Sequence, residues 1–389
     1  MKNKRIKLAA IVSGAFLLFT GCSNSADSNA SASTASGTSA VVSTTAAGTS
    51  QAGAPDLNGL SLDDIIKNAK AEGEVNSAGM PDSWANWGET WKEITGQYGI
   101  KHTDVDMSSA EELAMFEAEK NNATKDIGDV GQAFGPTAAE QGLALAYKTT
   151  YWDSIPDWAK DDKGNWIIAY YGTISVIVNK ELVDKVPTSF DDILNGKYKV
   201  SVGDVTKAAQ AQCAVLAAAI AYGGSETNIQ PGIDYFQKIA KQGRLDLGEL
   251  NMTRLEKGEI ALAFLWDYNA LGYRDQIKSN NANVNLEVNI PSEASIQSGY
   301  CTVINAYAKH PNAAALAREY ILSDKGQINL AKGYAKPVRD VTLPAEVSAK
   351  LIANDQYKNA RMIKDQAGWQ NSVSTLGTKW QEEVIAYAS

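Results

Sequence analysis

Three adjacent side chains, Trp266, Asp267 and Tyr268, form the combination in this chain best suited to hold a small ligand. They follow the predicted strand 261–266, and open α/β sheets place their ligands at the carboxyl ends of strands. An indole, a carboxylate and a phenol can surround an ammonium group or a sugar ring. Packing of Trp266 in the core is the structural alternative. We expect Trp266 and Asp267 to be the main contact from one half of the molecule.

A second group of candidate side chains follows the predicted strand 74–78. Asp82, Ser83 and Trp84 stand where a helix is predicted to begin. Free N–H groups at a helix start and the Ser83 hydroxyl suit an anion, whereas Asp82 and Trp84 suit a cation. A plain helix cap with Trp84 in the core explains the same residues. We expect Asp82 and Trp84 to face the first group across a cleft.

Five further side chains lie at predicted turns, helix starts or a crossing strand and complete the candidate site. The structural alternatives are helix capping for Ser109, a simple turn for Asp129 and half-buried strand packing for Tyr171. Because Tyr170 and Tyr171 are adjacent in a strand, only one of them can face a ligand, and the pattern does not decide which. The five are Ser109, Asp129, Tyr171, Thr173 and Asp204.

The residues needed for common catalytic machinery are scarce. His102 and His310 are the two histidines, so a Ser-His-Asp or Cys-His pair would have to use one of them. The motifs GxSxG and HExxH and the P-loop pattern do not occur. We therefore expect no catalytic residue, no cofactor and no metal site. An enzyme based on a pair of carboxylates stays open.

Strand and helix patterns alternate along the chain and must position these candidates. Such alternation predicts an α/β sheet covered by helices. The patterns form two units joined by extended segments, which predicts two lobes with a ligand cleft between them. Predicted strands are 74–78, 100–106 and 126–130 in the first unit and 199–202, 245–247 and 261–266 in the second; predicted helices include 60–71, 82–91, 110–120, 187–194, 208–222 and 231–241.

The amino-terminal segment has the form of a bacterial lipoprotein export signal. A basic start is followed by the apolar run 8–19, which is too short to span about 30 Å of hydrocarbon. Thr20-Gly21-Cys22 then resembles a lipobox, which implies lipidation of Cys22 and a membrane anchor. An ordinary signal peptide with a chance cysteine is the alternative. The Ser/Ala/Thr-rich stretch that follows predicts a flexible tether.

The net charge and the cysteines give further information about possible partners and about disulfide bonding. The formal net charge is −9, and about −13 without the four basic residues of the signal, so a nucleic-acid partner is not expected. The Ala-rich stretch 208–221 contains Gln210 and Gln212 and predicts a buried helix. Cys213 and Cys301 either form a disulfide or are two separate buried thiols, and we favour the thiols.

Four stretches of the chain occur in an order and spacing known from one protein family. They are WIIAYYGTISVIVNKELV (166–183), VPTSFDDILNGKY (186–198), HPNAAALAREYILSDKGQINLA (310–331) and GYAKPVRDVTLP (333–344). Together they resemble the substrate-binding proteins of bacterial ABC importers, in the group of ferric-ion, polyamine, thiamine and sugar-phosphate binders. The resemblance implies a two-lobed type II periplasmic-binding-protein fold, with crossings near 171–174 and 290–298.

The resemblance also implies a domain organisation and a function. The expected parts are a signal peptide (1–21), a lipidated tether (22–56), a first lobe (57–171 with 291–389) and a second lobe (172–290), with helices after residue 344 packed on the first lobe. Such a protein is no enzyme: it captures a small polar solute and delivers it to an ABC permease with its ATPase. It works outside the cytoplasm, held at the cell membrane by its lipid, and the choice between a periplasm and an outer surface stays open.

The nature of the solute stays open at this point. A polyamine-like cation and a phosphorylated or phosphonate anion both fit the candidate residues. Ferric ion is less favoured, because the adjacent pair Tyr170-Tyr171 lies too early in the chain to match the tyrosines of iron binders. A lipid-anchored extracellular carbohydrate-active enzyme and a surface adhesin are the alternatives from other classes.

Overall fold

The computed structural model describes residues 55–388. The predicted signal, the Cys22 lipidation site and most of the tether lie outside the described residues. Strands β2, β1, β3, β9, β4, β7, β5 and β6 lie side by side in that order, with β8 and β10 added on β4 and β11 on β9. The mixed α/β class predicted from the sequence is confirmed.

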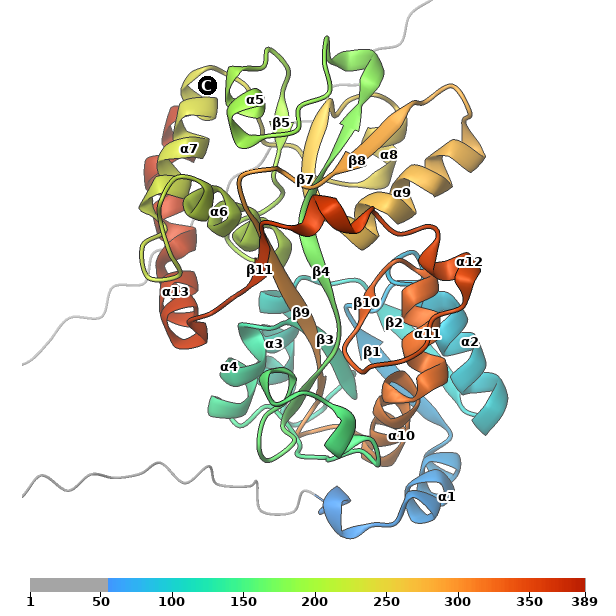
Figure 1. Cartoon of the computed structure of the whole chain (residues 1–389). Coiled ribbons are helices and arrows are strands. Elements are labelled where there is room, and N and C mark those ends of the chain that lie inside the picture. Colours follow the sequence, from blue (N-terminus) through green and yellow to red (C-terminus); the bar gives the residue numbers. More distant parts are fainter. Residues whose placement is uncertain (1–54, 389) are drawn as a thin grey trace, which may run out of the picture. The chain divides into compact units, whose positions relative to one another are not determined.

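One half of this sheet, here called the first lobe, is built on four strands. The parallel strands β2, β1 and β3 are joined by the antiparallel strand β9, and helices cover them (Figure 1). The strands are β1 (Glu74–Ala78), β2 (Lys101–Val105), β3 (Ile127–Gly131) and β9 (Ser295–Ile304); the helices are α1 (Leu62–Glu72), α2 (Trp87–Tyr98), α3 (Ser109–Ala118), α4 (Phe134–Glu140), α10 (Pro311–Leu322) and α11 (Asp324–Lys332).

The other half, here called the second lobe, has its own parallel core in which β5 lies between β6 and β7. Its strands are β5 (Val200–Ser201), β6 (Leu245–Asp246), β7 (Leu262–Trp266) and β8 (Leu286–Asn289), and its helices are α5 (Phe190–Asn195), α6 (Ala209–Ala221), α7 (Gln230–Lys241), α8 (Met252–Glu256) and α9 (Asp267–Asn280). The remaining elements are β10 (Lys336–Pro337), α12 (Ala345–Ser348), β11 (Ala360–Met362) and α13 (Gln366–Glu383), with short 3-10 turns at Leu57–Gly59, Trp152–Ser154, Asp157–Ala159, Lys180–Leu182, Asn354–Tyr357 and Ile385–Tyr387.

Strand β4 (Trp166–Asn179) belongs to both lobes. Through Thr173 it pairs with β9, and from Ile174 onward it pairs with β7 and β8. A single strand thus joins the two halves of the sheet, as Figure 1 shows at the centre of the molecule. The lobe boundaries given above from the sequence remain a prediction.

Local sequence accounts for how several elements begin and end. Ser61 caps α1 by accepting a hydrogen bond from the N–H of Asp64, and Gly73 ends that helix at φ +79°. The predicted start of α2 at Asp82 is wrong, because residues 82–86 form turns and the helix begins at Trp87. Ala85 and Asn86 there have positive φ, which a helix cannot accommodate.

The Ala-rich helix α6 is buried, as predicted. It packs against α7 on one side and against β7 and β9 on another, so almost no face of it reaches solvent. Small side chains permit this close approach. Cys213 on this helix and Cys301 on β9 are both free thiols, which confirms the preferred interpretation. Burial raises the pKa of Cys213 to about 12.

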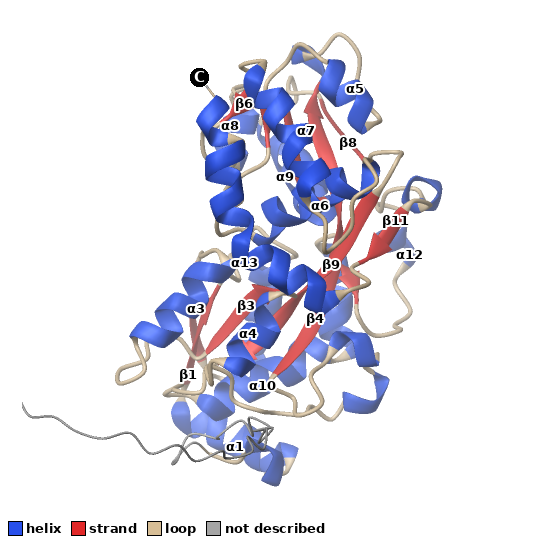
Figure 2. Cartoon of the chain, turned by 90° about the vertical axis from the view of Figure 1, so that its left-hand side faces the viewer, coloured by secondary structure: helices blue, strands red, loops and turns tan. Residues whose placement is uncertain are grey.

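The carboxyl-terminal helix does not pack where the sequence analysis expected. α13 lies against α7 of the second lobe: Trp380 meets Phe236 edge to face at 5.5 Å, and the Gln237 amide donates to the Glu383 carbonyl at 2.6 Å. Figure 2 shows α13 at the level between the two lobes. The helix thus packs mainly on the apolar side chains of α7, and near its start the Gln370 amide also donates to the Thr137 hydroxyl of α4 in the first lobe at 3.2 Å.

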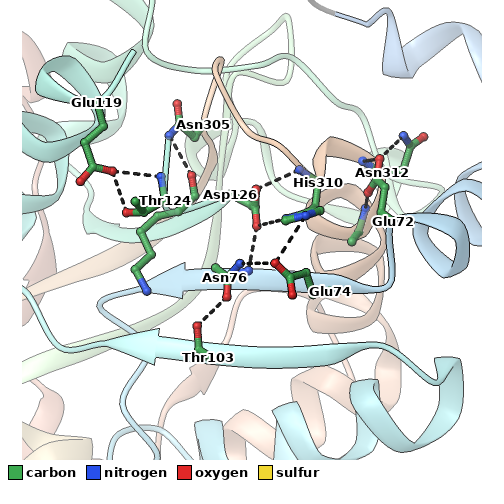
Figure 3. A network of polar contacts seen from close by, with 12 residues as sticks. Glu72, Glu74, Asn76, Thr103, Glu119, Thr124, Asp126, Asn305, His310 and Asn312 are labelled. Atoms are coloured by element: carbon green, nitrogen blue, oxygen red, sulfur yellow. Dashed lines mark hydrogen bonds and ion pairs between the residues drawn. The ribbon is translucent and has the colours of Figure 1, made fainter. Parts of the chain in front are cut away.

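A network of polar contacts ties the amino ends of β1 and β3 to the start of α10 (Figure 3). The Asp126 carboxylate accepts from the N–H of Asn76 at 2.8 Å and from the N–H of His310 at 2.9 Å, and it lies 2.9 Å from His310 Nδ1. His310 therefore has a structural position at the edge of the sheet where the strands begin.

Candidate ligand-binding site

A cavity of about 620 Å³ lies between the two lobes. The carboxyl ends of strands from both lobes open into it, as expected for α/β folds. Its lining comes from the first lobe (Gly79, Trp84, Asp106, Met107, Ser108, Ser109, Asp129), from the second (Val202, Gly203, Asp204, Lys207, Ala208, Ala209, Gln210, Leu245, Asp246, Leu247, Gly248, Glu249, Leu250, Leu265, Asn269, Tyr273), from β9 (Tyr300) and from the carboxyl-terminal segment (Trp380, Gln381, Ile385).

Buried carboxyl groups stand in the first-lobe wall. Asp129 on β3 is 1 % exposed and its Oδ2 accepts from the Tyr170 hydroxyl at 2.5 Å. Behind it, Glu112 of α3 is fully buried and its Oε2 accepts from the Asp129 N–H at 3.0 Å. Gly79 leaves the room for this carboxyl, since a Cβ at Gly79 would lie 2.3 Å from Glu112 Oε1. Burial raises the pKa of both acids well above the ordinary value.

The second-lobe wall includes the amino-terminal end of α6. The N–H groups of residues 209–211 donate to no acceptor within the described part of the chain. Just before the helix, Asp204 accepts from the N–H and the hydroxyl of Thr206. Lys207 reaches across to the first lobe, where its Nζ lies 2.6 Å from Glu111 Oε1. That bond, with those from Ser108, lowers the pKa of Glu111 to about 2.

Aromatic side chains from both lobes meet at the cavity. The Trp84 indole N–H donates to the Tyr273 hydroxyl at 3.1 Å, which joins the loop after β1 to helix α9. Tyr300 lines the cavity and stacks on Tyr170 with ring centroids 5.7 Å apart. These rings offer apolar faces beside the acidic walls, and such faces attract cations.

The structure brings four of the predicted site residues together at this cavity. Trp84, Ser109, Asp129 and Asp204 all line it. The Ser109 hydroxyl has a structural role, because it accepts a hydrogen bond from the Gly131 N–H at 2.9 Å. Asp82 and Ser83 are exposed and lie outside the cavity lining, since the loop turns away before α2 begins.

The expected main contact, Trp266 with Asp267, does not line the cavity. Trp266 is 1 % exposed and stands one layer behind the wall, where its indole N–H donates to the Tyr300 hydroxyl at 3.1 Å. Tyr268 is also buried and meets Tyr170 edge to face at 5.4 Å. Core packing, the structural alternative considered for Trp266, describes both rings.

Asp267 belongs to a separate set of contacts around the crossing strand. Its Oδ1 accepts from the N–H of Thr173 at 2.9 Å and from the N–H of Tyr268 at 3.0 Å, and its Oδ2 from the Tyr357 hydroxyl at 2.8 Å. Lys336 completes the set, with its Nζ 3.5 Å from the centre of the Tyr357 ring. We call Thr173, Asp267, Lys336 and Tyr357 the hinge cluster.

The adjacent tyrosines point to different surroundings. Tyr170 is fully buried and reaches Asp129, whereas Tyr171 packs edge to face on Trp158 and lies near Lys336. The structure therefore places Tyr171 and Thr173 outside the cavity. Gly172 between them is required, because a Cβ there would lie 2.6 Å from the Tyr268 ring.

Several cavity residues were missed by the sequence analysis. Asp106 follows β2 directly, so the rule used for the other strand ends would have found it. Glu249 follows β6, a strand of two residues that gives a weak pattern. Tyr273 lies two turns into α9, and no local signal distinguishes it from a core residue.

Neither histidine lines the cavity. His102 stacks on Trp91 at 3.7 Å, and its Nε2 lies 2.8 Å from the Ser77 hydroxyl. That hydroxyl donates instead to Asp104 at 2.5 Å, so its proton does not point at the imidazole. Burial lowers the pKa of His102 to about 4. This trio lacks the arrangement in which histidine accepts the proton of a serine nucleophile.

Two further properties concern residues 55–388 alone. They contain no group of three or more Cys, His, Asp or Glu side chains placed to hold a metal ion. In the same part of the chain, no helix has both the length and the apolar character required to cross a membrane.

Residues 122–364, more than half of the chain, match the family model of bacterial extracellular solute-binding proteins. No curated protein matches the chain. Among solved structures, the periplasmic binding protein AfuA from Actinobacillus pleuropneumoniae, with exogenous fructose-6-phosphate bound, is 21% identical with a TM-score of 0.61, over 80% of this chain and 98% of AfuA.

Two more similar structures show how widely the ligands differ. Iron-bound HitA from Pseudomonas aeruginosa is 16% identical with a TM-score of 0.61, over 78% of this chain and 98% of HitA. AgtB from A. tumefaciens R10, in complex with agropinic acid, is 13% identical with a TM-score of 0.65, over 80% of this chain and 98% of AgtB. These likenesses confirm the predicted two-lobed periplasmic-binding-protein fold, and at this identity they concern the fold alone.

Proposed function

Because this chain belongs to the family of bacterial extracellular solute-binding proteins, we propose that its interlobe cavity captures one small polar solute and that the closed protein delivers it to the permease of an ABC importer. As a member of that family it binds its solute outside the cytoplasm. The observation that carries the proposal is a cavity formed by strand ends from both lobes, with contacts across it at Lys207–Glu111 and Trp84–Tyr273.

Such a protein works as a clamp. A solute that touches both lobes binds the closed form more tightly than the open one, and it shifts the population by that difference in affinity. Strand β4 passes between the lobes without a break, and its partner changes from β9 to β7 between Thr173 and Ile174, which is where we place the bending. We assign Trp84, Asp129 and Asp204, with Tyr273 and Tyr300, to the ligand site.

Closure is tested by measuring the distance between the lobes. Spin labels at Glu117→Cys on α3 and Lys278→Cys on α9 would report it in a chain that also carries Cys22→Ser, because the other two native thiols, Cys213 and Cys301, are buried. Native mass spectrometry of the protein after exposure to a bacterial metabolite extract identifies a solute. We expect a bound mass and a shorter label distance when that solute is added. A solute that binds without moving the labels would contradict the clamp.

Attachment to the membrane belongs to the same proposal. Cys22 at the end of the export signal would carry the lipid, and the stretch 22–56 would place the folded body at a distance from the membrane. Replacing Cys22 with Ala should release the protein from the membrane fraction or leave the signal uncleaved. Unchanged membrane retention together with an unchanged amino-terminal mass would contradict lipidation.

A further inference from the structure

Resting on that proposed capture, we propose that the solute carries an ammonium group, which lies between the carboxylates of Asp106 from the first lobe and Glu249 from the second. Both residues line the cavity, and their strands, β2 and β6, belong to different lobes. A cation placed between them would therefore be held by both lobes at once, as closure requires.

Each of the remaining acids of the cavity has at least one partner within the protein through one of its oxygens. Asp246 pairs with Arg254 at 3.1 Å. Asp204 caps its own turn through Thr206, and Asp129 accepts from Tyr170. Asp106 and Glu249 make no hydrogen bond or ion pair through their carboxylates with any residue in 55–388. One unpaired carboxylate from each lobe is thus left facing the cavity.

No side chain of the cavity supplies the missing positive charge. Lys207 is the sole cationic residue in the described lining, and its Nζ is held at 2.6 Å from Glu111 and 3.9 Å from Asp204. Asp106 is exposed at the cavity wall, and the partial loss of solvent there, together with the nearby charges of Asp104 and Glu249, raises its pKa. Closing the empty protein therefore brings like charges together, and this opposes closure.

Asp129 provides an independent sign of a missing partner. It is 1 % exposed, lies in the same wall, and its Oδ1 has no hydrogen-bond partner among the described residues. A buried oxygen without a donor costs free energy, so such atoms call for an explanation in the bound state. An ammonium group has three N–H donors and can satisfy more than one of these oxygens.

The aromatic side chains of the cavity favour the same ligand class. Trp84 and Tyr273 meet from opposite lobes, and Tyr300 stands beside them in the lining. Ring faces attract an ammonium group and its adjoining methylene groups, and they offer nothing to a phosphate. The free N–H groups at the start of α6 can bind an acidic group at the other end of the same solute.

The test uses the full chain in detergent, with thermal unfolding and calorimetry as readouts. The probes are putrescine, spermidine and 4-aminobutyrate, with diacetylputrescine as the uncharged match and fructose 6-phosphate and inorganic phosphate as anions. We expect at least one amine to bind and diacetylputrescine and phosphate not to bind. Asp106→Asn and Glu249→Gln should each weaken that amine about tenfold, since each removes a charged partner.

A matched pair of variants controls for net charge. Asp162→Asn with Glu346→Gln removes two exposed carboxylates outside the cavity and should leave amine affinity unchanged. Binding of an anion without any amine would overturn the ammonium proposal while leaving solute capture intact. Amine binding that survives both cavity substitutions would overturn the assignment of Asp106 and Glu249. If none of the probes binds, the ammonium proposal is also overturned. Native mass spectrometry with a metabolite extract then tests solute capture separately.

Discussion

Two groups of acidic and aromatic side chains in this protein look alike in sequence and differ in how their oxygens are satisfied. In the hinge cluster, each carboxylate oxygen of Asp267 accepts from Thr173, Tyr268 or Tyr357. In the cavity, the exposed carboxylates of Asp106 and Glu249 have no partner in residues 55–388. A carboxylate whose bonds are complete holds the fold together, and one whose bonds are incomplete remains available to a ligand.

The structure does not place the expected main ligand contact, Trp266 with Asp267, at the cavity. Trp266-Asp267-Tyr268 stands at the end of β7, where ligands are commonly bound, and yet all three side chains are buried against the crossing strands. Asp106 stands at the end of β2 under the same rule, and it does line the cavity. Position at the end of a strand therefore identifies candidate ligand-binding residues. Contacts with later parts of the chain decide which of these side chains face the cavity and which are buried.

The largest expected effect comes from the hinge cluster. Asp267→Ala would leave the Thr173 N–H, the Tyr357 hydroxyl and Lys336 without their buried partner, and we expect a loss of about 3 kcal/mol in the free energy of unfolding. Urea denaturation followed by tryptophan fluorescence measures it. Asp106→Ala should change the stability by less than about 0.5 kcal/mol. If the two variants lost the same stability, the distinction between the two groups would be lost.

The second expected effect concerns pH and the buried acid Glu112. Burial raises the pKa of Glu112 well above its ordinary value, so the folded protein keeps a proton that the unfolded chain gives up. Its contribution to stability is complete below the unfolded pKa and is lost as pH rises through the folded pKa. Glu112→Gln cannot lose a proton, so the difference between its unfolding temperature and that of the parent should grow in its favour as the pH rises from about 5.

Glu117→Gln is the control for that experiment, because Glu117 lies on the same helix with its side chain 55% exposed. Its unfolding temperature should follow the parent at every pH. A constant difference between Glu112→Gln and the parent across this range would show that the buried carboxyl does not titrate with folding.

The smallest expected effect comes from the ion pair that crosses the cavity. Lys207 and Glu111 have side chains 42% and 46% exposed, so water screens the pair although the atoms are 2.6 Å apart. We expect Lys207→Gln to lower the stability by about 1 kcal/mol or less, and less again at high salt. Thermal unfolding at low and high ionic strength measures it. A loss as large as that of Asp267→Ala would place the pair among the structural contacts.

The sequence by itself determined the alternating α/β pattern, the buried Ala-rich helix and the position of most strands. These follow from local periodicity and capping, which a chain carries in neighbouring residues. It also identified Trp84, Asp129 and Asp204 as cavity residues, because each stands at the end of a predicted strand or the start of a helix. The same reasoning would have found Asp106, had the rule been applied to every strand.

Only the tertiary structure decided which acids are satisfied and where the carboxyl-terminal helix packs. Asp267 meets Tyr357 from 90 residues away, and Trp380 meets Phe236 on a helix of the second lobe. Asp106 and Glu249 come to one cavity from different lobes. Such pairings depend on how distant parts of the chain fold together, and local patterns of hydrophobicity and charge do not identify the partner.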